Sequence, residues 1–196
     1  MKLIAGLGNP GKAYLGSRHN IGFDAIEALA RKQGVVLKKG IFSKTAFCRM
    51  HYKGKEFILA RPLTFMNLSG ASIKYLAGKF KVASGDILII CDDLDLQLGR
   101  MKIKQGGSSA GHHGLESIAS SLKDKDFCRL RLGIGRPKDK DFVSEYVLSR
   151  FTQSENGEKE QILRKAVQCC YIWAEFGINK AMEIFNKKVN KEQCNE

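Results

Sequence analysis

The sequence lacks any run of about 18 consecutive apolar residues, which is the length that a membrane-spanning helix needs. It also lacks, at its start, the order of charged, apolar and small residues that marks a secretion signal. Residues 1–7 instead predict a buried strand. These absences predict a cytoplasmic protein without a membrane partner.

Closely spaced cysteine pairs are missing as well. No Cys-x-x-Cys spacing occurs, and most of the cysteines stand in apolar or strand-like segments, so the sequence favours buried thiols in a reducing compartment over a zinc site or a disulfide framework. The six cysteines are Cys48, Cys91, Cys128, Cys169, Cys170 and Cys194.

The usual nucleotide-binding signatures are incomplete. Gly6 and Gly8 begin a Gly-x-Gly pattern, but the next glycine is Gly11, directly after Pro10, so the third glycine of a dinucleotide fingerprint is absent. No Walker lysine motif occurs either. Neither type of nucleotide cradle is therefore predicted.

Acidic residues are scarce relative to basic ones. The chain has 20 Asp and Glu against 33 Lys and Arg, which gives a formal net charge of +13 and favours an anionic partner such as nucleic acid. At 196 residues and 43% hydrophobic, the chain is long enough to bury one sizeable core. We expect a single soluble domain.

Apolar runs and helical periodicity alternate along the chain. This order predicts an α/β fold, with a single domain over residues 1–185, a twisted mixed β-sheet flanked by helices on both faces, and a frayed tail over residues 186–196. The predicted strands lie within residues 2–8, 44–52, 55–62, 86–96, 99–107 and 127–137, and the predicted helices within residues 20–34, 64–80, 110–122 and 154–185, the last as one or two helices.

Polar side chains gather where predicted strands end and helices begin. In open α/β sheets ligands bind outside the carboxyl ends of the strands, so we expect these loops to converge on one cleft. The side chains they offer are a potential base, a potential carboxylate partner and several amides: His19, Asn9, Asn20, Asn67, Asp92, His112 and His113.

Five segments of the chain carry motifs that resemble those of bacterial-type peptidyl-tRNA hydrolase. They are "GLGNPGKAYLGSRHNIGF", "RPLTFMNLSG", "DDLDLQLGRMKIK", "GHHGLESI" and "FCRLRLGIGRP", in this order along the chain. The resemblance implies an enzyme that hydrolyses the ester between a peptide and the 3'-terminal ribose of tRNA, and so recycles tRNA from prematurely released peptidyl-tRNA. It also implies a monomer without a metal or an organic cofactor.

Ester hydrolysis at neutral pH needs a base, a water molecule and donors aimed at the oxyanion. His19 has the titration range of such a base, and a carboxylate bonded to one of its ring nitrogens would fix the tautomer. Asp92 is the candidate for that carboxylate. Asp93 and Asp95 compete from the same stretch, although alternation along the strand end points them differently, and the resemblance favours Asp92.

The amides near the predicted cleft allow two interpretations each. Asn9 is either a turn residue before Pro10 or, as the resemblance implies, a site residue that orients water or contacts the substrate carbonyl. Asn67 either caps a helix that begins near residue 68 or binds the peptide main chain and the oxyanion. We expect Asn20 to cap a helix, and Met66 to pack the cleft wall.

One motif departs from the family pattern. Where the family usually has Gly-His-Asn-Gly, this chain has "GHHG" at residues 111–114. His112 matches the family's histidine, whereas His113 replaces an asparagine that the family uses for substrate or water. A histidine is bulkier than asparagine, so this contact is in question.

Basic and aromatic residues suggest how tRNA is held. Lys102 and Lys104 alternate onto one face of a predicted strand, and Arg129 and Arg131 do so on another, so they are candidates for a phosphate clamp, with solvated strand faces as the alternative. Tyr14 and Phe65 are candidates for stacking on a terminal base, with core packing as the alternative for Phe65.

Two other functions remain open from the sequence. One is a noncatalytic RNA-binding protein on the same scaffold, against which the presence of His19, Asn9, Asn67 and Asp92 argues. The other is hydrolysis of a different small ester or nucleoside, which the strongly basic composition disfavours, because a small substrate needs no extended positive field.

Overall fold

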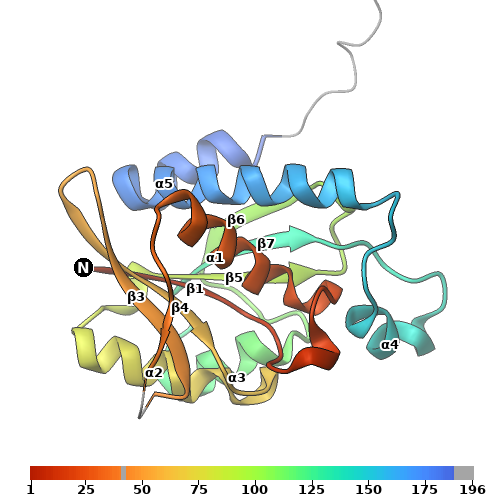
Figure 1. The fold of residues 1–196 in the computed structure, drawn as a ribbon, viewed down its shortest axis with the longest axis horizontal. Coiled ribbons are helices and arrows are strands. Elements are labelled where there is room, and N and C mark those ends of the chain that lie inside the picture. The colour runs from red at the N-terminus through yellow and green to blue at the C-terminus, as the bar shows by residue number, and fades with distance from the viewer. Residues whose placement is uncertain (41–42, 188–196) are drawn as a thin grey trace, which may run out of the picture.

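The computed structural model describes residues 1–40 and 43–187, and in it a single seven-stranded sheet runs through the molecule (Figure 1). The strand order is β2-β3-β4-β1-β5-β7-β6. The strands are β1 (Lys2–Gly6), β2 (Lys38–Lys39), β3 (Thr45–Tyr52), β4 (Lys55–Pro62), β5 (Ile87–Asp93), β6 (Met101–Gln105) and β7 (Cys128–Gly133).

The sheet is mixed, as predicted. Strands β4, β1, β5 and β7 are parallel neighbours, while β2, β3 and β6 run antiparallel to the strands they pair with. The predicted hairpin turns at Lys53 and Gly54, which both have positive φ, as a two-residue turn between twisted strands requires. The carboxyl ends of the four parallel strands therefore open at one edge of the sheet.

Helices cover both faces of the sheet, which confirms the predicted fold class. Helices α1 and α5 pack on one face, and α2 and α3 on the other (Figure 1). The helices are α1 (Ile21–Lys32), α2 (Ser69–Phe80), α3 (His113–Leu122), α4 (Val143–Leu148) and α5 (Asn156–Phe185), with short 3-10 turns η1 (Lys12–Tyr14), η2 (Arg18–Asn20), η3 (Met66–Leu68), η4 (Ser84–Asp86) and η5 (Lys140–Phe142).

Strand β5 lies at the centre of the core. Its residues are buried throughout; Leu88 and Ile90 face the α1 and α5 side, and Ile87, Ile89 and Cys91 face the α2 and α3 side. Full burial of an aliphatic side chain stabilises the fold by about 1.5–3 kcal/mol, so a strand buried on both faces is a rigid support. Asp92 and Asp93, the last two residues of β5, are also buried, and by the same alternation they face opposite sides of the sheet.

Two glycines bring helix α1 against the strand ends. A Cβ atom on Gly22 would overlap the Ile90 carbonyl and the backbone of Leu7, and one on Gly6 would overlap the Gly22 carbonyl. The close approach is fixed by hydrogen bonds from Leu7 N to Ile90 O at 2.9 Å and from Phe23 N to Leu7 O at 3.2 Å. Turn η2, which carries His19, is thereby held directly above the end of β5.

The C-terminal third differs in detail from the sequence prediction. Helix α4 was not predicted. Helix α5 is interrupted at Gly177, whose φ of 83° is not helical, which agrees with the predicted one or two helices. Asn186, assigned to the frayed tail, donates to Ile103 O and accepts from Ile103 N, so it is held on β6. The rest of that tail from residue 188 onward, with Cys194, lies outside the described residues.

Two further predictions concern the cysteines and the membrane. Among the described residues, four of the five cysteines are buried and all five are free thiols. No helix in the described part of the chain is long and apolar enough to cross a membrane.

Candidate active site

A cleft of about 150 Å³ opens where β5 ends. His19, Asp92 and His112 line it on one side. Val143, Ser144 and Val147 of α4 line it as well, and the loop of residues 109–113 closes it. The loops after β1, after β5 and before α3 therefore do converge on one cleft, to which α4 adds a wall. The loop after β4, which was also predicted to converge there, does not line it, and neither do Asn9 and Asn20.

A single carboxylate oxygen joins the two histidines of this cleft. His19 Nδ1 lies 2.8 Å and His112 Nε2 lies 3.1 Å from the same atom, Asp92 Oδ1. The two imidazole rings are 5.2 Å apart and tilted by 42°. Asp92 is 5% exposed, so both contacts are shielded from water.

The position of His112 determines which of its nitrogens carries the proton. It stands at the N-cap of α3, where its Nδ1 accepts hydrogen bonds from Gly114 N at 3.1 Å and Leu115 N at 3.4 Å. An accepting nitrogen has no proton, so a neutral His112 is protonated on Nε2 and donates to Asp92. The first turn of α3 thus orients a hydrogen bond toward the carboxylate.

Asp92 in turn determines the tautomer of His19. Burial disfavours the charged carboxylate, but the neighbouring imidazoles, His112 foremost, outweigh burial and hold the pKa of Asp92 well below its usual range. An ionised Asp92 accepts a hydrogen bond from the N–H group of His19 Nδ1, which leaves the lone pair on Nε2 of His19. That arrangement makes His19 a potential base.

The two competing carboxylates line the same cleft, but each pairs with an arginine and not with His19. Asp93 Oδ2 pairs with Arg131 Nε at 2.8 Å, and Asp95 Oδ1 pairs with Arg136 Nη2 at 2.7 Å. Burial raises the pKa of Asp93, an effect that the Asp95 amide and Arg131 partly offset. The structure thus brings Asp92 to His19, and pairs its two rivals with arginines.

Asn9 and Asn20 form a clamp within the connection between β1 and α1. Asn20 does not cap α1 with its side chain, contrary to our prediction; its Oδ1 accepts from Asn9 N at 2.8 Å and its Nδ2 donates to Asn9 O at 3.0 Å. Asn9 Oδ1 in turn accepts from Met66 N at 2.8 Å. Asn20 binds Asn9 and does not cap the helix, because this arrangement satisfies two backbone groups at once.

The residues after β4 lie beside the start of α3 without lining the cleft. Met66 is 5% exposed and packs beside Gly114, while Asn67 and Phe65 are exposed. Asn67 is not a helix cap, because the N-cap positions of η3 and α2 are Phe65 and Leu68 and neither has a side-chain cap. Phe65 is exposed, so it is not a core residue. Its ring meets that of Tyr14 edge to face, with centroids 6.3 Å apart.

His113 points outward. Its side chain is 75% exposed, lines the outer part of the cleft and lies 3.5 Å from Glu116 Oε2. His112 and His113 thus have different surroundings although they are adjacent, because a strand-like N-cap residue and the first residue of a helix point in different directions.

Four cations share one face of β6 and β7. Lys102 lies opposite Arg131, and Lys104 opposite Arg129, so we call these four residues the cationic stripe. Arg129 is 1% exposed and donates to Ser108 O and Lys125 O, so it ties two loops and is not available as a phosphate clamp, contrary to the prediction. Burial, together with Arg131, Arg129 and Lys102, lowers the pKa of Lys104.

The two histidines and the aspartate of the cleft are also candidate metal ligands. Among the described residues, His19, Asp92 and His112 form the one group of His, Cys, Asp and Glu whose ligand atoms lie within 4.8 Å of one another. Two imidazoles and a carboxylate suit zinc, but here both imidazole nitrogens already use the same carboxylate oxygen. The arrangement therefore suits proton transfer.

Sequence reasoning missed Arg18 and helix α4. Arg18 is 5% exposed and sits beside His19, and α4 supplies a wall of the cleft. The signal for α4 was the apolar spacing of Val143, Val147 and Leu148, which is too short to distinguish a helix from a loop.

The fold and the site together define a class of protein: an α/β domain with a histidine–carboxylate pair in a cleft beyond the carboxyl ends of its parallel strands, beside a basic sheet face. The family model "Peptidyl-tRNA hydrolase" matches residues 3–193. The chain belongs to the peptidyl-tRNA hydrolase family, and is thus an enzyme of the hydrolase class that acts on ester bonds.

Relatives and solved structures agree with this assignment. Peptidyl-tRNA hydrolase of Caldanaerobacter subterraneus subsp. tengcongensis is 41% identical over 95% of this chain and 100% of its own length. That of Aquifex aeolicus is 42% identical over 96% of this chain and 97% of its own length. The crystal structure of peptidyl-tRNA hydrolase from Acinetobacter baumannii has a TM-score of 0.88 at 35% identity, covering 93% of each chain.

Proposed function

We propose that the protein hydrolyses the ester between a peptide and the 3'-terminal ribose of tRNA by a water molecule that His19 activates. The observation that supports this most strongly is the 2.8 Å contact of His19 Nδ1 with Asp92 Oδ1. With that nitrogen engaged, Nε2 of His19 is the basic nitrogen of a residue that lines the cleft. We propose that this activity recycles tRNA and that it does so in the cytoplasm.

The reaction is then a proton transfer coupled to an attack. His19 Nε2 takes a proton from water while the water oxygen attacks the ester carbonyl, and the ionised Asp92 stabilises the imidazolium that forms. The imidazolium returns the proton to the ribose oxygen as the ester bond breaks. A positioned base of this type contributes about 10²–10⁴-fold to the rate.

The amides of the loops after β1 and β4 are the proposed substrate contacts. Asn9 accepts a hydrogen bond from Met66 N and is held by Asn20, which supports a role for Asn9 in orienting water or the substrate carbonyl. Asn67 is exposed and not used as a cap, which supports a role in binding the peptide main chain and the oxyanion. His112 holds Asp92, and His113 lies at the outer edge of the cleft.

The cationic stripe and the aromatic pair supply the tRNA contacts. Lys102, Lys104 and Arg131 would meet phosphates of the acceptor end, and the pair formed by half-buried Tyr14 and exposed Phe65 would stack on the terminal base. All proposed groups come from one chain, so we propose that the enzyme acts as a monomer.

The decisive experiment compares two substrates that differ in one charge. Purified N-acetylaminoacyl-tRNA should release its N-blocked amino acid rapidly, whereas the same tRNA with a free α-amino group should be cleaved much more slowly. Asn67→Ala should lower kcat as well as affinity, because a contact remote from the ester orients it in the transition state. No release from either substrate would indicate the noncatalytic RNA-binding alternative, and equal rates would remove the role of Asn67.

A further inference from the structure

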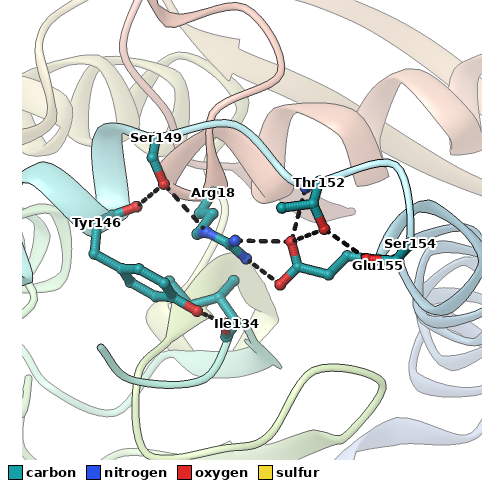
Figure 2. Close-up of polar contacts among 7 residues, drawn as sticks. All are labelled: Arg18, Ile134, Tyr146, Ser149, Thr152, Ser154 and Glu155. Carbon is teal, nitrogen blue, oxygen red and sulfur yellow. Dashed lines mark hydrogen bonds and ion pairs between the residues drawn. The ribbon is translucent and has the colours of Figure 1, made fainter. Parts of the chain in front are cut away.

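Arg18, the residue before His19, is buried and is the centre of a polar network that the proposed mechanism does not use. Figure 2 shows its guanidinium enclosed by the connection between α4 and α5. We call this network, made of Arg18, Tyr146, Ser149, Thr152 and Glu155, the Arg18 network. It joins the turn that carries the proposed base to a segment more than a hundred residues away in the sequence.

The strongest contact is a two-pronged ion pair. Arg18 Nη1 donates to Glu155 Oε1 at 3.0 Å, and Nη2 donates to Oε2 at 2.8 Å. Glu155 Oε2 also accepts from the backbone N and the hydroxyl of Thr152, at 2.7 and 2.9 Å. Hydrogen bonding by Arg18 lowers the pKa of Glu155. The carboxylate is therefore shared between the turn of His19 and the start of α5.

The remaining contacts fix the plane of the guanidinium. Its carbon lies 4.4 Å from the Tyr146 ring centroid and 4.8 Å from that of Phe151. Nε donates to Ser149 Oγ at 3.3 Å, and that hydroxyl donates to Tyr146 O at 2.7 Å. The Tyr146 hydroxyl donates to Ile134 O at 2.6 Å, so the network also reaches the residue after β7.

The backbone follows the side chains. Arg18 N donates to Ser149 O at 2.9 Å, and Ser17 and Arg150 form an isolated antiparallel bridge. Turn η2 and the segment after α4 are thereby joined at consecutive residues. A displacement of this segment would be transmitted directly to η2, and so to the imidazole of His19.

We propose that Arg18 and Glu155 are positioning residues that hold His19 on Asp92 and set the distance from His19 to the α4 wall of the cleft. The wall and the base belong to different parts of the chain, since Val143 and Val147 come from α4 and His19 from η2, and both attach to the Arg18 network. This inference rests on the proposed role of His19.

The test replaces the carboxylate and keeps its shape. In Glu155→Gln one of the two acceptor oxygens is replaced by an NH2 group, which cannot accept a hydrogen bond from Arg18 or Thr152. We expect kcat on a peptide esterified to a short 3'-terminal fragment to fall about tenfold with KM little changed, because small misplacements of a catalytic group are costly. The proton signal of His19 Nδ1–H, measured by NMR, should shift or broaden.

The chain offers a matched control in Glu175. This glutamate is also on α5, its side chain is 23% exposed against 26% for Glu155, and both of its oxygens lie 2.8–2.9 Å from Lys53 Nζ. Glu175→Gln should lower stability less than Glu155→Gln, because Lys53 is 57% exposed and Arg18 only 6%, while kcat and the His19 signal stay at the parent values. Equal kcat and equal His19 signals in both variants would overturn the proposal, since the ion pair would then only stabilise the fold.

Two milder variants keep the test decisive if Glu155→Gln fails to fold. Ser149→Ala removes the contact with Arg18 Nε, and Tyr146→Phe removes the contact with Ile134 O. Each should lower kcat severalfold in the same direction, and parent-like kcat in both would contradict the proposal. Failure of the proposed function is distinguishable: His19→Ala would then turn over normally, whereas the NMR signal of His19 reports positioning independently of turnover.

Discussion

The cleft lies at the end of β5 and the cationic stripe runs along the neighbouring strands β7 and β6, yet their charges are arranged in opposite ways. In the cleft, two imidazoles converge on one carboxylate, and each participating nitrogen has a partner. In the stripe, four cations share one sheet face, and among the described residues Asp93, paired with Arg131, is the carboxylate that offsets them. The first arrangement is complete without tRNA, whereas the second is left repulsive until phosphates arrive.

This difference separates chemistry from binding within one small molecule. A complete cleft needs no reorganisation when the ester arrives, which is the condition for efficient electrostatic catalysis. A stripe with excess positive charge attracts the substrate over a distance, at a cost in folding stability. Changes in the cleft should therefore alter the rate, and changes in the stripe should alter binding and stability.

After the removal of His19 itself, the largest expected effect comes from the carboxylate of the cleft. Asp92→Asn should lower the single-turnover rate by about 100-fold or more, because an amide no longer fixes the tautomer of His19 or stabilises its protonated form. Affinity for tRNA should be unchanged. Rates are measured with saturating enzyme on N-acetylaminoacyl-tRNA, and a rate close to that of the parent would show that Asp92 does not serve His19.

An intermediate effect is expected from the stripe. The double variant Lys102→Ala, Lys104→Ala should raise KM for full-length peptidyl-tRNA and flatten its salt dependence, with each lost phosphate contact removing about one unit of slope. On a peptide esterified to a short 3'-terminal fragment, the variant and the parent should have equal kcat/KM. Comparable losses on both substrates would mean that the stripe supports the cleft.

Arg131 sharpens this test because it belongs to both regions. Its side chain pairs with the buried Asp93, so Arg131→Ala removes a cation and also leaves a carboxylate without its partner. We expect this variant alone to lose stability as well as tRNA affinity, measured by thermal unfolding and by binding of uncharged tRNA. A stability equal to the parent's would remove the distinction between Arg131 and the lysines.

A smaller effect concerns stability and pH. The folded protein lowers the pKa of Lys104, so its charged form is unfavourable in the fold at every pH below that folded pKa, and the cost disappears as pH rises through it toward the unfolded value. Lys104→Ala should therefore raise the free energy of unfolding at pH 7 by about 0.5 kcal/mol or less. Urea unfolding at pH 7 and pH 10 should show that this gain is smaller at pH 10. Destabilisation by Lys104→Ala at pH 7 would contradict the claim that burial and neighbouring cations disfavour the charge of Lys104.

The smallest effect is expected at the position that departs from the family pattern. His113 is exposed, with Glu116 as its neighbour at 3.5 Å, so His113→Asn should leave kcat and folding stability unchanged and shift KM by no more than a few-fold. Steady-state kinetics on peptidyl-tRNA measure this. A large fall in kcat would mean that His113 acts on the reacting ester.

Local patterns in the sequence were sufficient for the strands, and insufficient for contacts between distant segments. The apolar run of β5 predicts a strand buried on both faces, and alternation separates Asp92 from Asp93, because both follow from the two-residue period of a strand. The convergence of loops on one cleft follows from the parallel order of the strands.

What the sequence could not provide were the partners across the fold. A short polar side chain before a helix predicts a cap, but Asn20 instead binds the backbone of Asn9. An alternating arginine predicts a solvent-facing cation, but Arg129 is buried under two loops. Arg18 gave no signal, because Glu155 is far along the chain. In each case tertiary hydrogen bonding overrides the local preference.

The most direct test of the central claim is the single-turnover rate of His19→Ala, measured beside its affinity for uncharged tRNA in the same preparation. The account predicts that hydrolysis of N-acetylaminoacyl-tRNA is abolished while tRNA affinity stays within about twofold of the parent, because the base belongs to the cleft and makes none of the proposed phosphate contacts. A near-normal rate in this variant would contradict the account, and a parallel loss of tRNA binding would show that cleft and stripe are not separate.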